Sequence, residues 1–140
     1  HTEIKVTPTG AKLVEIAARL GGDFITSRLV PLSTGVDMVE CSFATLLEEE
    51  VKYQNTISQG SAIRFIKGEK GILSVIDGVE AALDMPGVQE VELYMRPGDH
   101  IKRPENSSDR VGHVIAIGKD ADEAAHNAEA ALAAIHVQVE

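Results

Sequence analysis

The sequence predicts an α+β fold in which antiparallel sheets are covered by packed helices. Short segments with alternating apolar and polar residues, typical of strands, recur along the 140-residue chain. Segments with apolar residues at helical spacing lie between them, and an Ala-rich segment near the C-terminal end has strong helix propensity. The order of elements in the second half, β-β-α-β-loop-β-α, favours antiparallel pairing.

The first predicted element is a hairpin made of strands 2–7 and 12–16 around the turn 8–10. The proline of this turn suits the second position of a type I turn, and the glycine suits the left-handed residue after it. A three-residue loop places Thr7 opposite Ala11. Four apolar side chains then share one face of the hairpin: Ile4, Val6, Val14 and Ile16.

Two carboxylates face each other on the other side of this hairpin. Counting outward from the turn places Glu3 opposite Glu15, about 5 Å apart. At an effective dielectric constant of about 20, two such charges repel by roughly 3 kcal/mol. Either water screens the pair on a solvated face, or a divalent cation bridges it. Carboxylate oxygens suit magnesium, which also takes waters and phosphate oxygens.

Two helices are expected after the hairpin. Asp23 is a plausible N-cap for a helix that runs to Val30, where Pro31 interrupts it. A second helix restarts at 33–35 and ends in the acidic run 48–50. Cys41 lies on its apolar pattern and is expected to be a packed core thiol.

The second half begins after a polar connection at residues 51–60. We therefore expect two units, 1–60 and 61–140, the second a small α+β lobe. Its predicted elements are a hairpin of strands 61–67 and 71–76, a helix at 78–84, a strand at 88–95, a charged loop at 97–109, a strand at 111–118, a helix at 120–134 and a short strand at 137–139.

Composition excludes several classes of function. The chain holds 22 acidic and 13 basic residues, a net charge of −9, which argues against nucleic acid and anionic membrane surfaces as partners. No apolar run has the length of a membrane span. A single cysteine forms no internal disulfide, so we expect a reducing, cytoplasmic location. The five histidines show no zinc spacing.

Further residues after Glu15 extend the candidate site. Arg19 follows it by four positions, where a guanidinium could grip phosphate oxygens or form a surface ion pair. Gly21 and Gly22 then precede a helix, where a ligand could approach the backbone and an anion is favoured. The alternative is a tight turn that uses the glycines for positive φ.

These residues also carry a resemblance. The chain resembles the core of the ATP-grasp ligases in the runs His1-Thr2-Glu3, Gly10, Leu13-Val14-Glu15-Ile16-Ala17-Ala18-Arg19-Leu20-Gly21-Gly22-Asp23 and Leu32-Ser33-Thr34-Gly35-Val36-Asp37. Residues 96–99 and 109–114 resemble the C-terminal lobe of the carboxylate–amine ligase branch. L-amino-acid ligases look most similar, whereas biotin carboxylase, carbamoyl-phosphate synthetase and phosphoribosylamine–glycine ligase are more distant.

The resemblance implies a chemistry for these positions. Family members carry magnesium (or manganese) on two acidic residues that match Glu3 and Glu15, with ATP as co-substrate. The family's Arg, which contacts the transferred phosphate or acyl phosphate, matches Arg19. Gly21, Gly22 and Asp23 would border the acceptor site. The parent enzyme would activate a carboxylate as an acyl phosphate, which an amine or ammonia then attacks.

Two departures from the family pattern qualify this expectation. Ala17 stands where the usual Glu-x-Asn-x-Arg motif has Asn, which removes one metal ligand. The family's nucleotide-clamping lobe and phosphate-gripping lysines precede the matched segment, so we expect a C-terminal fragment that is inactive alone. Two alternatives stay open: a small-molecule-binding or dimerising regulatory module, and a structural role. Apolar surface left by missing lobes could also pair with a second copy.

Overall fold

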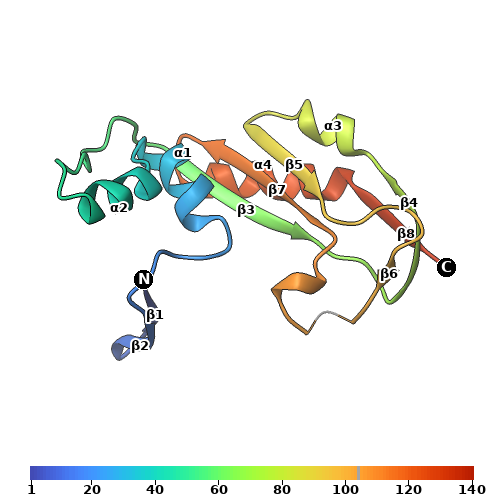
Figure 1. Cartoon of the computed structure of the whole chain (residues 1–140). Coiled ribbons are helices and arrows are strands. Elements are labelled where there is room, and N and C mark those ends of the chain that lie inside the picture. Colours follow the sequence, from blue (N-terminus) through green and yellow to red (C-terminus); the bar gives the residue numbers. More distant parts are fainter. Residues whose placement is uncertain (104) are drawn as a thin grey trace.

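The computed structural model describes residues 1–103 and 105–140 and shows a mixed α+β chain (Figure 1). Its elements are β1 (Thr2–Thr7), β2 (Gly10–Ile16), a π-helical turn η1 (Ile25–Leu29), α1 (Val30–Thr34), α2 (Met38–Leu46), β3 (Gly60–Ile66), β4 (Gly71–Asp77), α3 (Val79–Leu83), β5 (Val88–Leu93), β6 (His100–Ile101), a 3₁₀ turn η2 (Ser107–Asp109), β7 (Gly112–Gly118), α4 (Ala121–Ala134) and β8 (His136–Val139). The predicted α+β class with antiparallel sheets is confirmed.

In the hairpin β1–β2, Glu3 pairs with Glu15 as predicted, but the register between this pair and the turn differs from the prediction. Thr7 pairs with Gly10 and not with Ala11, so the predicted loop register is wrong. A register shift between Glu3 and Ile4 then restores the pairing, because Val14 has no partner in the ladder. Gly10 has the expected positive φ, at 107°.

The shift changes which apolar residues face the same side. Ile4 is opposite Leu13, so Leu13 takes the place that the sequence assigned to Val14. All the large apolar side chains of the hairpin are exposed. In Figure 1 the hairpin stands off from the remainder of the molecule, with the N-terminus at its base.

The helices between the hairpin and β3 begin and end at other residues than predicted. The N-cap of η1 is Phe24 and not Asp23, and no side chain forms a capping hydrogen bond there. Pro31 does not interrupt a helix, since it sits in the first turn of α1, where its missing N–H costs nothing. Gly35 does not start α2 but ends α1 with φ 75°.

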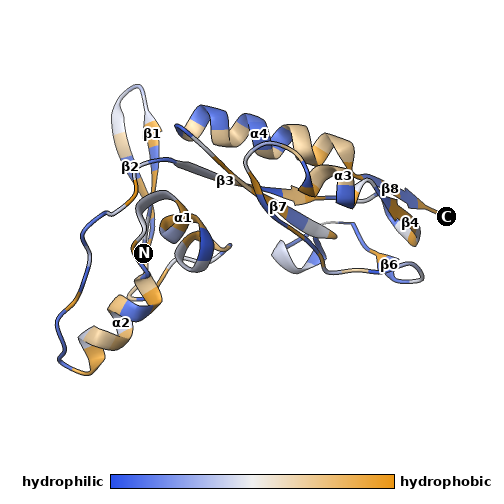
Figure 2. Cartoon of the chain, turned by 90° about the horizontal axis from the view of Figure 1, so that it is seen from above, coloured by the Kyte–Doolittle hydropathy of each residue, from blue (hydrophilic) through white to orange (hydrophobic). Residues whose placement is uncertain are grey.

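Asp37 caps α2 by accepting from the backbone N–H groups of Val39 and Glu40. Cys41 is buried, as expected for a packed thiol. Much of the apolar side of α2 is exposed, including Phe43 and Leu46, and Figure 2 shows apolar residues along this helix and the hairpin.

The lobe that follows contains two three-stranded antiparallel sheets, ordered β3-β7-β5 and β6-β4-β8. Strands 61–67 and 71–76 therefore lie in different sheets, and the prediction that they form a hairpin is wrong. The charged loop predicted at 97–109 also holds β6 and η2.

The two faces of the β3-β7-β5 sheet are covered by different parts of the chain. Arg64, opposite Val114, bonds to Glu129 of α4, so this side faces α4. Phe65 and His113, the next pair, face the other side. Figure 2 shows α4 along one side of the sheet and α1 toward the other.

The core lies within this lobe. Its two clusters of buried residues are Ile66, Leu73, Ala82, Ile101, Val111, Val114, Ala131 and Ile135, and Ala62, Ala116, Ala124 and Ala128. Among the described residues, no helix is both long enough and apolar enough to cross a membrane.

Candidate functional site

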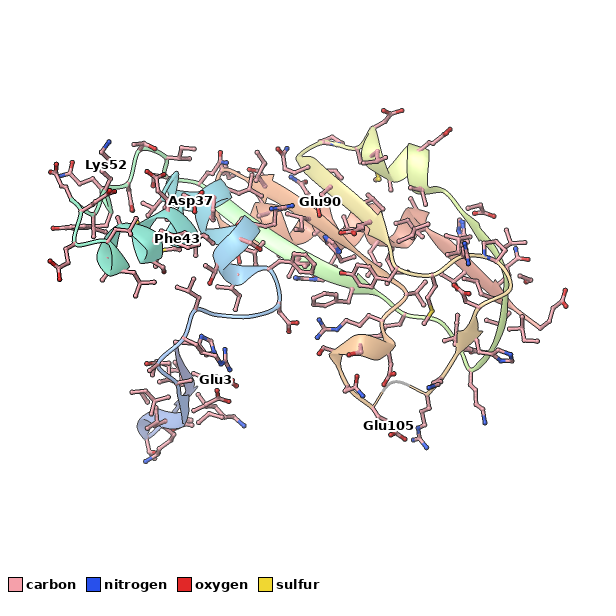
Figure 3. All side chains as sticks on the ribbon, viewed as in Figure 1. Glu3, Asp37, Phe43, Lys52, Glu90 and Glu105 are labelled. Atoms are coloured by element: carbon pink, nitrogen blue, oxygen red, sulfur yellow. The ribbon has the colours of Figure 1, made fainter. Side chains whose placement is uncertain are left out.

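The acidic corner of the hairpin is the first part of the candidate site. Glu3 and Glu15 are exposed and directly opposite in the ladder (Figure 3 labels Glu3). Lys5 and Lys12 form the next charged pair on the same face. Adjacent carboxylates with free access to solvent provide the hard oxygen donors that magnesium prefers. The residues present therefore fit a divalent cation that keeps water or phosphate as its other ligands.

Arg19 contacts Glu15 at this corner and forms the surface ion pair that was one of its two predicted roles. Its Nη2 donates to Oε1 of Glu15 at 2.9 Å, and its Nη1 donates to the carbonyl of Leu20 at 3.1 Å. About half of each side chain in the Arg19–Glu15 pair is exposed, so the ion pair contributes little to stability. The guanidinium can therefore leave Glu15 for a competing anion at small cost. Ala17 offers no side-chain oxygen.

His1 pairs with the residue that follows β2 at the base of the hairpin. The N–H of Ala17 donates to the His1 carbonyl at 2.9 Å. A side chain on Gly21 would meet the His1 ring at 3.3 Å. The backbone before and after Arg19 thus lies close to His1.

Positive φ occurs after the glycine pair and not within it. Gly21 and Gly22 are absent from the residues with positive φ, whereas Asp23 (49°) and Phe24 (63°) have it. The interpretation of the pair as a positive-φ turn is therefore wrong. Thr26 Oγ1 donates to the Gly21 carbonyl at 2.9 Å, which ties the glycine to η1.

Asp23 is held by the second lobe. Arg110 donates to both of its carboxylate oxygens, at 2.8 and 3.2 Å. This hydrogen bond with Arg110 lowers the pKa of Asp23 below its ordinary value, against a smaller opposing effect of burial. The guanidinium of Arg110 also lies 3.5 Å from the ring centroid of Phe65. Asp23, expected at the acceptor-site border, thus joins the two halves of the chain.

His113 is the main polar residue that the sequence reasoning missed. It is completely buried in β7, with Nδ1 2.6 Å from the hydroxyl of Tyr94 and Nε2 3.0 Å from Glu90. Glu92 lies 3.9 Å from Nδ1. Burial raises the pKa of Tyr94, with Glu92 adding to the effect. The alternation of Glu90 and Glu92 along β5, continued by Tyr94 directly after it, was the available signal.

Among the described residues, Glu90, Glu92 and His113 form a group with the spacing of metal ligands. Both ring nitrogens of His113 already have hydrogen-bond partners, Tyr94 at Nδ1 and Glu90 at Nε2, so a metal bound at either nitrogen would break one of these hydrogen bonds. We therefore regard the group as a hydrogen-bonded cluster between strands.

Comparison with known proteins identifies the family of this chain. Residues 64–140 match the family model of the L-amino acid ligase C-terminal domain 2. The uncharacterized protein y4rH of Sinorhizobium fredii (strain NBRC 101917 / NGR234) is 31% identical over 118 residues, which is 84% of this chain and 24% of that protein.

Three solved structures share the fold. The L-amino acid ligase of Bacillus licheniformis superposes with a TM-score of 0.82 at 21% identity and covers 100% of this chain. Phosphoribosylglycinamide synthetase of Anaerococcus prevotii gives 0.80 at 19%, and N5-carboxyaminoimidazole ribonucleotide synthetase of Thermotoga maritima gives 0.69 at 20%, each covering 99% of this chain.

The chain spans only 36% of the length of each of these solved structures and about a quarter of the curated relative. Its fold is that of the C-terminal portion of an ATP-grasp ligase. On the match over residues 64–140, the chain belongs to the L-amino acid ligase C-terminal domain family.

Proposed function

We propose that this chain is the C-terminal part of an ATP-dependent ligase that activates a carboxylate as an acyl phosphate and joins it to an amine or ammonia. The observation that carries the proposal is that Glu3 and Glu15 pair across one hairpin and that Arg19, just beyond it, contacts Glu15. The family match and the ATP-grasp fold support the reaction class. Phosphoryl transfer needs little from a protein beyond positioning and charge neutralisation, which such a corner can supply.

Each residue of the corner has a separate role in the proposal. Glu3 and Glu15 would hold magnesium (or manganese), which when bound neutralises charge on the phosphates of ATP. Arg19 exchanges its carboxylate partner for an oxygen of the transferred phosphoryl group, a switch that an exposed ion pair permits. Gly21, Gly22 and Asp23 border the acceptor site.

Metal binding at Glu3 and Glu15 can be tested directly on the isolated chain. Titration with Mn²⁺ should broaden the NMR signals of residues 3 and 15 first, because these carboxylates lie opposite each other. Glu3→Gln and Glu15→Gln should each reduce this broadening, whereas Glu49→Gln, a change to an exposed acid away from the hairpin, should not. Broadening that is unchanged in both hairpin variants would reject the metal site.

The reaction itself is tested in a longer polypeptide that supplies the preceding ATP-grasp segments. It should hydrolyse ATP only with magnesium and a carboxylate–amine pair. Glu15→Gln should abolish this activity and leave the circular dichroism spectrum unchanged, since Glu15 is exposed. Normal turnover by Glu15→Gln would reject its assignment.

A non-catalytic binding module is the second candidate. It is favoured by a groove of about 650 Å³ beside β3, whose lining includes Phe65, Leu132 and Val137. Calorimetry of the isolated chain with amino acids and nucleotides separates the two functions. Tight binding of a small molecule without ATP would favour the module, and its absence would favour the ligase.

A further inference from the structure

We infer that His113 and Arg110 are positioning residues, which hold Asp23 and Phe24 in the left-handed conformation and thereby fix the backbone that follows Arg19. The catalytic consequence rests on the proposed ligase function, because the segment 21–23 is the border assigned to the acceptor. The positioning itself is a property of this chain and can be tested without catalysis.

The positive φ of Asp23 and Phe24 must be stabilised by contacts from outside this segment. Residues with a side chain rarely adopt positive φ, and two in succession are rarer. Glycines at 21 and 22 could adopt it freely, but the chain places it one step later. Such conformations persist where surrounding contacts determine them. Phe24 is the N-cap of η1 with φ 63° and ψ 5°, and no side chain caps it.

The first external contact is the fork between Arg110 and Asp23. Two parallel N–H···O bonds fix both the distance and the orientation of the carboxylate. Arg110 itself is fixed, because its guanidinium lies over Phe65 on β3. The position of Asp23 is therefore set by β3, on which Phe65 lies 42 residues after Asp23 in the sequence.

The second contact is the stack of Phe24 on His113. The ring centroids are 4.4 Å apart with an interplanar angle of 30°. Glu90, when ionised, only accepts, so Nε2 of His113 carries the hydrogen, and a neutral ring accepts at Nδ1 from the hydroxyl of Tyr94. Both partners thus prevent the buried ring from rotating, and the face offered to Phe24 is fixed.

A third contact holds the other end of the same segment against β5. Arg28 of η1 donates from Nε to the second oxygen of Glu90 at 3.0 Å. Tyr94, His113, Glu90 and Arg28 form one hydrogen-bonded chain from β5 and β7 to η1 (Figure 3 labels Glu90 on β5). Three contacts within residues 23–28 therefore connect the segment after Arg19 to the second lobe.

The test uses amide hydrogen exchange on the intact chain. The N–H groups of Arg28 and Leu29 both donate to the carbonyl of Phe24, so their exchange reports on this segment. Tyr94→Phe removes one hydrogen bond to His113 and should speed exchange at both amides about three- to tenfold. The matched control, Tyr53→Phe, changes the other tyrosine of the chain and should have no effect.

Variants of Phe24 test the contact of its ring with His113. Phe24→Tyr keeps the ring and should keep slow exchange. Phe24→Gly lacks the ring but adopts positive φ without cost, so fast exchange in this variant would come from loss of the stack. Unchanged exchange at Val114 and Ile115, buried in β7, would show that the lobe stays folded. Wild-type rates in both Tyr94→Phe and Phe24→Gly would overturn the inference.

The catalytic consequence is measured in the longer polypeptide. Tyr94→Phe should raise KM for the amine about three- to tenfold and leave KM for ATP unchanged, because only the acceptor border moves. Altered exchange with unaltered kinetics would overturn the acceptor role. A wild-type protein without ligase turnover would reject the proposed function, while the exchange result would still decide the positioning role.

Discussion

Asp23 and Arg110 form the ion pair whose contribution to stability depends most clearly on pH. The folded pKa of Asp23 lies below its unfolded value of about 3.9, because Arg110 stabilises the ionised form. The contribution is therefore present above pH 3.9 and disappears as the pH falls through the lower folded value. Half of the Asp23 side chain is exposed, so we expect only about 0.5–1 kcal/mol at pH 7.

Urea unfolding of the wild type and Asp23→Asn at pH 7, 5 and 3 measures this difference. The two curves should differ at pH 7 and 5 and converge toward pH 3. Asp84→Asn, at the end of α3, serves as the matched control at an exposed position. A difference that persists unchanged at pH 3 would contradict the ion pair as its source.

Arg19 should matter to catalysis and hardly to folding. Its pair with Glu15 is exposed and local, so Arg19→Ala should change the free energy of unfolding by less than about 1 kcal/mol. In the longer polypeptide the same change should reduce kcat at least about a hundredfold, since a cation at the transferred group is lost. Thermal unfolding and steady-state kinetics provide the two measurements. Full turnover by Arg19→Ala would contradict its assignment.

At the level of elements, α4 depends on small residues where it meets the sheet. Ala124, Ala128 and Ala131 are fully buried against it, whereas Ala133 on the same helix is exposed. Ala128→Leu should therefore lower the free energy of unfolding by about 1–3 kcal/mol through overpacking. Ala133→Leu should stay within about 0.5 kcal/mol. Urea unfolding measures both, and equal effects would contradict the packing described for α4.

The strands were predictable where the pattern is local, and their partners were not. Alternation located β3 and β4 nearly to the residue, and their short connection favoured a hairpin. Instead, Ser61 pairs with Ile117, and Leu73 pairs with Val139. Such pairings join distant parts of the sequence, so no window around either strand contains them.

The candidate site also has a part that the local sequence predicts and a part that only tertiary contacts create. Glu3 and Glu15 face each other across one turn, and a hairpin count found them although the loop register was wrong. His113 obtains its partners from Glu90 on β5, from Tyr94 just after that strand, and from Phe24, which is 89 residues earlier. In sequence it is one polar residue in an apolar strand. The left-handed backbone likewise depends on tertiary contacts of Asp23 and Phe24, which glycine positions do not reveal.

For the whole molecule, burial is unevenly divided between the two predicted units. Both core clusters belong to residues 62–135 together with flanking apolar residues of the same lobe. Residues 1–60 instead expose most of their large apolar side chains: Ile4, Val6, Leu13, Val14, Ile16, Leu20, Ile25, Val39, Phe43, Leu46, Leu47, Tyr53 and Ile57. A surface of this kind is typical of an interface, which fits the proposed place of this unit in a larger ligase.

This division predicts that residues 59–140 fold without the rest of the chain. The excised lobe keeps both clusters and all of β3, and loses mainly the contacts of η1 and α1 with that strand. It should show a cooperative thermal transition by circular dichroism, whereas residues 1–58 alone should show none, because they bury too little apolar surface to offset chain entropy. Loss of Phe24 also uncovers His113, so Tyr94→Phe should destabilise the excised lobe less than the full chain. A lobe without a cooperative transition would mean that the first unit is part of the core, contrary to the burial seen here.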